Sequence, residues 1–147
     1  MISFVFVCVG AFFLGAIPVG YLVGRYHGVD VRSVGSGNIG ATNVGRTLGK
    51  RAGAVTFVLD SLKGVAAVFL PLLVTNDPGN LDSLQPITGL LSLFGHCYSP
   101  FLNFRGGKGV ATGFGMFVAL SPIAAAISMR GVIWERRSEG IKARFDL

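Results

Sequence analysis

Residues 2–24 form an apolar run that carries no charged side chain. As a helix, the run would reach roughly 35 Å, which is enough to cross the hydrocarbon core of a bilayer. It lacks the positively charged start of a signal peptide and continues past any cleavage point. The run therefore predicts a retained transmembrane helix, with a kink at Pro18.

The whole chain has the composition of a membrane protein. Of its 147 residues, 51% are hydrophobic and only 14% are charged, and the mean hydropathy is +0.63. A soluble surface needs more charge than this. Further apolar segments follow at 53–75, 84–102 and 110–128. We therefore predict an all-α integral membrane protein, a bundle of about four transmembrane helices with glycine-rich cytoplasmic loops.

The connections between the apolar segments differ in charge. Residues 25–52 hold five basic residues and one acidic residue, so 5 − 1 = +4, whereas residues 76–83 hold two acidic residues and no basic one, giving −2. The positive-inside rule places the first connection in the cytoplasm and the N-terminus outside. Because the basic residues are divided among short loops and form no stripe, nucleic-acid binding is not expected.

Residues 35–46 read GSGNIGATNVGR and are the most distinctive stretch of the chain. Glycines allow tight turns and close approach to a ligand, and Arg46 could grip a phosphate. The stretch is either a phosphate-binding loop or a glycine-rich connector. Residues 35–40 also match the GxGxxG dinucleotide pattern, but that pattern requires a preceding strand, and here the flanks are membrane spans.

A second glycine-rich segment, FRGGKG at residues 104–109, precedes the last apolar segment. Its two cations and the N-terminus of the following helix could cradle a phosphate. Alternatively, it is a basic turn that only sets the topology. It is not a P-loop, because Asn103 and Gly109 stand where that motif needs glycine and Ser or Thr.

Polar residues inside the apolar segments are the remaining candidates. Asp60 and Lys63 lie three positions apart, so they can pair on one helical face, as a structural ion pair or as part of a reaction, unless Lys63 snorkels to the surface. His96 is a candidate base or phosphate ligand, or a structural residue.

Cys8 and Cys97 lie near opposite faces of the membrane, so no disulfide is expected. No Cys or His cluster has metal-ligand spacing, so we expect no metal and no cofactor.

Taken together, residues 35–46, 60–64, 95–96 and 104–112 resemble the bacterial acyl-phosphate:glycerol-3-phosphate acyltransferase family, PlsY. The resemblance covers roughly residues 3–125. It implies an enzyme of the bacterial inner membrane that moves an acyl chain from acyl-phosphate to the 1-hydroxyl of glycerol 3-phosphate. The products are lysophosphatidic acid and phosphate, in phospholipid synthesis. The family lacks a His-x₄-Asp motif, and so does this chain.

The resemblance also assigns roles to individual residues. It implies phosphate binding by Ser36, Arg46 and Lys108. It implies backbone N–H groups donated by Gly106, Gly107 and Gly109. His96 would orient a substrate or accept a proton, although a substrate phosphate oxygen could serve as the base instead.

Residues 129–147 depart from the family and from the charge pattern. They carry five basic and three acidic residues, so 5 − 3 = +2. Four spans would place these residues outside the membrane, where the charges of the earlier connections predict no excess of basic residues. The family continues with a third motif of His, Asn and Glu. We therefore divide the chain into a PlsY-like membrane domain at 1–128 and a divergent basic tail at 129–147. A shifted reading frame or early termination would explain this tail and would leave the chain inactive.

A different class of function also fits the glycine-rich basic loops. The alternative is a small membrane transporter or binding protein for a phosphorylated solute. Against a transporter, the chain shows no internal repeat, and both basic loops are predicted on one side of the membrane.

Overall fold

The computed structural model describes residues 2–121, and these residues contain helices and no strand. The long helices are α1 (Ile2–Ala16), α4 (Lys50–Phe69), α5 (Pro78–Cys97) and α6 (Val110–Leu120). The shorter elements are α2 (Val19–Tyr26), α3 (Ala41–Leu48) and the 3₁₀ turns η1 (Leu70–Leu73) and η2 (Pro100–Leu102). The prediction of an all-α bundle is confirmed for these residues. The tail at 129–147 lies outside the described residues.

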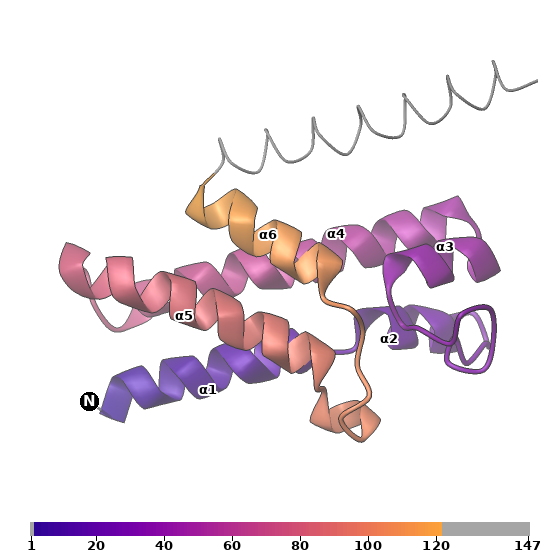
Figure 1. Cartoon of the computed structure of the whole chain (residues 1–147), viewed down its shortest axis with the longest axis horizontal. Coiled ribbons are helices and arrows are strands. Elements are labelled where there is room, and N and C mark those ends of the chain that lie inside the picture. The colour runs from indigo at the N-terminus through magenta and orange to yellow at the C-terminus, as the bar shows by residue number, and fades with distance from the viewer. Residues whose placement is uncertain (1, 122–147) are drawn as a thin grey trace, which may run out of the picture.

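The long helices lie side by side along the long axis of the molecule (Figure 1). Helix α1 packs against α5, and α4 packs against α6. The backbones of α1 and α5 approach so closely that a Cβ at Gly15 would overlap the Ser92 backbone, and one at Gly95 would overlap that of Phe12. Small residues at helix contacts are typical of membrane bundles, where close packing replaces the hydrophobic effect between helices.

Two continuous stretches are long and apolar enough to cross a membrane, residues 2–26 and 50–73. The first stretch is interrupted at Pro18, as predicted, between α1 and α2. Lys63 Nζ donates a hydrogen bond of 2.8 Å to the carbonyl of Ile17 at this interruption. A broken helix is tolerated in a membrane when other groups bind its freed carbonyls, and Lys63 provides such a group.

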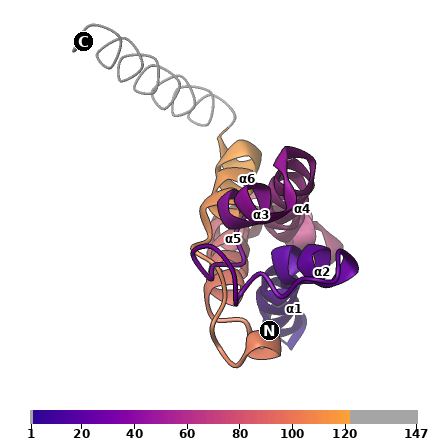
Figure 2. The same cartoon turned by 90° about the vertical axis from the view of Figure 1, so that its right-hand side faces the viewer.

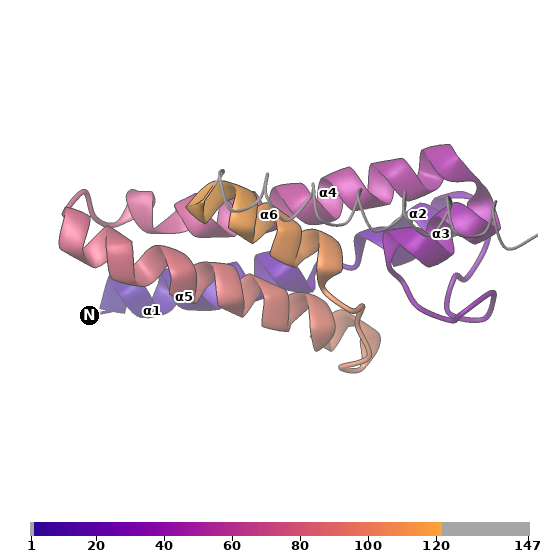
Figure 3. The ribbon, with the colours of Figure 1, turned by 45° about the horizontal axis from the view of Figure 1, so that its top comes forward.

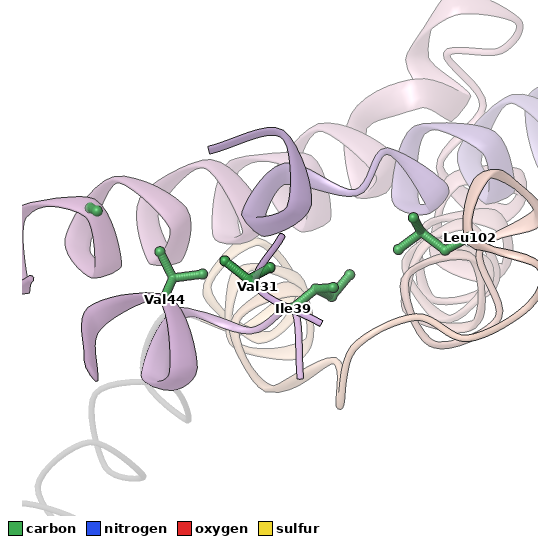
Figure 4. Close-up of a cluster of buried hydrophobic side chains, with 5 residues drawn as sticks. Val31, Ile39, Val44 and Leu102 are labelled. Atoms are coloured by element: carbon green, nitrogen blue, oxygen red, sulfur yellow. The ribbon is translucent and has the colours of Figure 1, made fainter. Parts of the chain in front are cut away.

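The predicted connection at 25–52 is wrong as a loop, because it contains α3 and the first turn of α4. Val31, Ile39 and Val44 of this segment are buried in one cluster with Leu102 of η2, and Figure 4 shows their side chains. The segment therefore has an apolar core of its own. Sequence reasoning missed α3 because the glycines hide the single apolar face of this eight-residue helix.

The predicted outer loop at 76–83 is also shorter than expected. Helix α5 begins at Pro78, where the carboxylate of Asp77 accepts a hydrogen bond of 3.1 Å from the Asn80 N–H. Asp77 is thus an N-cap, and Pro at the first helical position needs no intrahelical partner. At its other end, α5 stops at Cys97, earlier than the predicted residue 102, and η2 follows.

Different segments of the chain lie at the two ends of the bundle. The N-terminus and the connection between α4 and α5 lie at one end, and α2, α3 and the start of α4 lie at the other (Figures 1 and 3). Viewed toward that second end, α2, α3 and the glycine-rich segments face the reader (Figure 2). The polar segments that the sequence analysis singled out therefore meet at one end of the molecule.

Candidate active site

The segment before α3 is wrapped around the side chain of Asn43, which is only 2% exposed. The Asn43 amide donates to the carbonyls of Val31 at 3.0 Å and Val34 at 3.1 Å. Its oxygen accepts a hydrogen bond of 2.8 Å from the Ser36 N–H. Gly35 adopts a φ of 60° directly beside this oxygen, where a Cβ would overlap it. One buried amide therefore fixes the backbone that presents Ser36.

Helix α3 begins where the glycine-rich stretch turns. The Asn38 side chain accepts a hydrogen bond of 2.8 Å from the Gly40 N–H, and Gly40 is the N-cap of the helix. The first N–H groups of any helix have no acceptor within it, and they carry the positive end of the helix dipole. Part of the predicted phosphate loop is thus a helix N-terminus.

The second glycine-rich segment folds back on the end of α5. The N–H of Gly106 donates to the Cys97 carbonyl at 3.0 Å, and the N–H of Gly107 donates to the His96 carbonyl at 3.1 Å. The expectation that these two N–H groups face a phosphate therefore needs correction. The glycines instead permit close approach, because a Cβ at Gly107 would overlap the His96 ring.

A pocket of about 350 Å³ lies between these segments. Five of the predicted site residues line it, namely Ser36, Arg46, His96, Lys108 and Gly109. Gly107 does not line it, and Gly106 lines a neighbouring open hollow of about 760 Å³ that shares Ser36 and Asn38 with the pocket. The structure thus brings together residues that are far apart in the sequence.

The pocket suits an anion. The N-terminal residues of two helices line it, Gly40 to Thr42 of α3 and Gly109 to Ala111 of α6. Within residues 2–121, neither Arg46 nor Lys108 forms an ion pair, so both cations can meet a ligand. Helix N-termini and cations together favour phosphate or carboxylate groups. No three His, Cys, Asp or Glu side chains in the described part of the chain gather closely enough to hold a metal ion.

A buried polar cluster forms part of the pocket wall. Asp60 and His96 both line the pocket and are 1% and 3% exposed. Asp60 Oδ1 lies 2.9 Å from Lys63 Nζ, which confirms the predicted pairing, and 3.6 Å from His96 Nδ1. Lys63 is itself buried, so the alternative that it snorkels to the surface is wrong. Sequence reasoning missed the approach of Asp60 to His96, because no local spacing links α4 to α5.

A family model described as Glycerol-3-phosphate acyltransferase matches residues 5–134 of this chain. The chain belongs to the glycerol-3-phosphate acyltransferase family. The acyltransferase of Trichlorobacter lovleyi is 50% identical over 115 residues, which cover 78% of this chain and 57% of the relative. That of Aquifex aeolicus is 45% identical over 130 residues, which cover 88% of this chain and 65% of the relative.

Solved structures of a glycerol-3-phosphate acyltransferase have the same fold. A crystal structure of PlsY, an integral membrane glycerol 3-phosphate acyltransferase, in its glycerol 3-phosphate form superposes with a TM-score of 0.76 at 44% identity. The alignment covers 86% of this chain and 62% of PlsY. The lysophosphatidic acid form gives 0.74 at 42% identity. This chain thus spans less than two thirds of the length of the acyltransferases it matches, and the family expected from its motifs is confirmed.

Proposed function

We propose that this chain transfers an acyl group from acyl-phosphate to the 1-hydroxyl of glycerol 3-phosphate, yielding lysophosphatidic acid and inorganic phosphate. The observation that carries the proposal is the pocket, which Arg46 and Lys108 line together with the N-terminal residues of two helices. Both proposed substrates carry phosphate, which this combination favours. The PlsY relative has been solved in glycerol 3-phosphate and lysophosphatidic acid forms, which agrees with this acceptor and this product.

The reaction makes one ester bond and breaks one mixed anhydride. The hydroxyl oxygen of glycerol 3-phosphate attacks the acyl carbonyl carbon, and the carbon–oxygen bond to phosphate breaks with its electron pair leaving on phosphate. Acyl-phosphate is already activated, so positioning and charge stabilisation supply most of the catalysis. Arg46 and Lys108 stabilise phosphate charge, and Ser36 donates a hydrogen bond to a phosphate oxygen.

The hydroxyl proton has two possible acceptors, His96 and a phosphate oxygen of a substrate. His96 lies in the pocket wall, so a His96→Gln variant separates the two possibilities. If His96 is the base, this variant loses turnover on the order of 100-fold or more while retaining glycerol 3-phosphate affinity. If the substrate phosphate is the base, turnover falls much less.

The acyl chain of the donor also has a place in this arrangement. Phe57, Val110 and Ala111 give the pocket an apolar wall next to its cationic residues. Such a wall suits the first carbons of an acyl chain that continues between helices into the bilayer. The donor, glycerol 3-phosphate and membrane lipid are thus the proposed partners, and no cofactor is needed.

Orientation in the membrane follows from charge. The end that holds the pocket carries seven basic residues in its connections and short helices against one acidic residue, so 7 − 1 = +6 over residues 25–51 and 103–109. Residues 76–83 at the other end carry −2. We therefore place the pocket on the cytoplasmic side of a bacterial inner membrane, with the N-terminus outside.

The test is product formation by the purified chain in detergent, with a long-chain acyl-phosphate and glycerol 3-phosphate. Mass spectrometry measures the lysophosphatidic acid formed, and the inorganic phosphate released is measured in the same reaction. Arg46→Ala and Lys108→Ala should each reduce turnover on the order of 100-fold or more. Arg51→Ala is the matched control, because Arg51 lies at the same end but lines neither hollow.

Failure of the folded wild-type chain to form lysophosphatidic acid would contradict the proposal. Equal losses in the Arg51→Ala control would contradict the assigned site, since a general charge effect would then explain the data. Flux of a phosphorylated solute in proteoliposomes, without acyl transfer, would instead favour the transporter.

A further inference from the structure

We propose that Asp60 is a positioning residue for His96, which lines the pocket. Asp60 holds the ring proton on Nδ1 and leaves Nε2, on the side of the Gly107 loop, as the acceptor. The consequence of this arrangement for turnover rests on the proposed function. The arrangement itself does not, because it concerns two protein side chains. Asp60 does not need to touch either substrate for this role.

The first support is the burial of both partners. The side chains of Asp60 and His96 are 1% and 3% exposed, and Asp60 Oδ1 lies 3.6 Å from His96 Nδ1. Both atoms are buried, and His96 Nδ1 has no hydrogen-bond partner among the described residues. Buried charges are screened little by solvent, so a carboxylate at this separation favours the proton on the facing nitrogen.

The second support is the different surroundings of the two ring nitrogens. The Nε2 atom lies against Gly107, where a Cβ would overlap it. The Gly107 N–H also donates to the His96 carbonyl at 3.1 Å, which holds the loop against the histidine. One ring edge therefore faces a carboxylate, and the other faces the loop that carries Lys108. A histidine with one nitrogen fixed by a carboxylate presents a defined tautomer at the other.

The third support is the contact that Lys63 makes with Asp60. Lys63 Nζ lies 2.9 Å from Asp60 Oδ1 and donates to the Ile17 carbonyl at 2.8 Å. These two contacts of Lys63 fix the position of the Asp60 carboxylate beside His96. A chain of polar contacts thus runs from the interruption between α1 and α2 to the pocket.

A purely structural ion pair between Asp60 and Lys63 is the competing explanation. It predicts that removing both charges leaves the tautomer of His96 unchanged. Removing Asp60 alone would leave a buried ammonium unpaired and endanger folding. The double variant Asp60→Leu with Lys63→Met avoids the unpaired charge, because it replaces the pair by apolar side chains. It also removes the donor to the Ile17 carbonyl, so thermal unfolding in detergent checks that it is folded.

The experiment is ¹⁵N NMR of the full chain in detergent, labelled at histidine, at a pH where the rings are neutral. The sequence has two histidines, so His27→Gln assigns the signals of His96. We expect a protonated Nδ1 and an unprotonated Nε2 in the wild type, and loss of this preference in the double variant. Ser92→Ala, another buried polar change on α5, should leave the spectrum unchanged.

Kinetics form the second arm. The double variant should lower kcat on the order of 100-fold with little change in KM for glycerol 3-phosphate, and Asp60→Glu should recover part of the loss. A wild-type ring protonated on Nε2, or a spectrum that the double variant does not alter, would overturn the proposal. The NMR arm needs no turnover, so an inactive chain would count against the proposed function and leave this inference to be decided by the spectrum.

Discussion

The hydroxyl of Ser99 donates a hydrogen bond of 2.6 Å to the carbonyl of Ala16, the last residue of α1. Both residues are buried. Pro18 ends α1 at this point, so the Ala16 carbonyl has lost its place in a helical ladder and needs another donor. Ser99, which stands just before η2, supplies that donor.

Replacing Ser99 by alanine should destabilise the chain. The Ala16 carbonyl would remain buried without its side-chain donor, which costs about 1–2 kcal/mol. Thermal unfolding in detergent measures the loss. Ser83→Ala is the control, because the Ser83 hydroxyl is exposed and bonds only within its own helix. An equally small change in both variants would contradict the importance of this contact.

Gly107→Ala should damage the pocket. The added methyl group would overlap the His96 ring, so either the ring or the loop that carries Lys108 must move. A displacement of about 1 Å can cost on the order of 100-fold in turnover. Product formation and glycerol 3-phosphate affinity are the measurements. Gly113→Ala, where a Cβ would meet Leu93 at an ordinary distance of 3.8 Å, should be nearly neutral.

Asn43→Ala should loosen the segment that presents Ser36. The change leaves the carbonyls of Val31 and Val34 and the N–H of Ser36 without this partner, each at a cost of about 1–3 kcal/mol where water cannot replace it. Hydrogen exchange should therefore accelerate across residues 31–40. The exposed Asn80, changed to alanine, serves as the control. Unchanged protection of residues 31–40 in Asn43→Ala would show that the amide does not hold this segment.

The Asp30–Arg32 pair gives a pH prediction. The guanidinium of Arg32, 2.7 Å away, lowers the pKa of Asp30 from 3.8 to about 2. A lowered pKa in the folded state means that the stabilisation is complete above about pH 4 and disappears as the pH falls through about 2. The melting temperatures of wild type and Asp30→Asn should therefore converge between pH 4 and pH 2. Because the pair is at the surface, the difference at pH 6 should be small and should shrink in salt. A gap that stays constant with pH would contradict the pair's contribution.

The proposed orientation can be tested by labelling. In a chain whose Cys8 and Cys97 are replaced by alanine, single changes Ser33→Cys and Ser83→Cys place thiols at opposite ends of the bundle, where both serines are exposed. A membrane-impermeant maleimide should label the Ser83→Cys chain in spheroplasts. It should label the Ser33→Cys chain only after the membrane is opened. The reverse pattern would invert the topology.

The features that sequence predicted correctly are local ones. Hydropathy located the first two spans, Pro18 marked the interruption, and the spacing of Asp60 and Lys63 predicted their contact. Each of these follows from neighbours within a few positions, where helical geometry fixes which side chains meet. The two glycine-rich motifs likewise identified most of the residues that the pocket brings together.

The features that sequence did not predict depend on contacts between distant segments. Helix α3 is stabilised by burial of Val44 against Val31 and Ile39. An isolated helix of eight residues is not stable without such tertiary packing. The use of the Gly106 and Gly107 N–H groups could not be foreseen, because their acceptors belong to the end of another helix. The approach of Asp60 to His96 likewise exists only once α4 and α5 have packed.

The interruption after Ala16 also bears on how the chain is assembled in a bilayer. The first span emerges from the ribosome long before its partner, since Ser99 follows Ala16 by 83 positions and Lys63 follows Ile17 by 46. Until those residues arrive, the Ala16 carbonyl must be hydrated, paired with a lipid headgroup or held by the insertion machinery. The first helix is therefore an unfinished membrane helix at synthesis, and its completion depends on the later segments that also build the pocket.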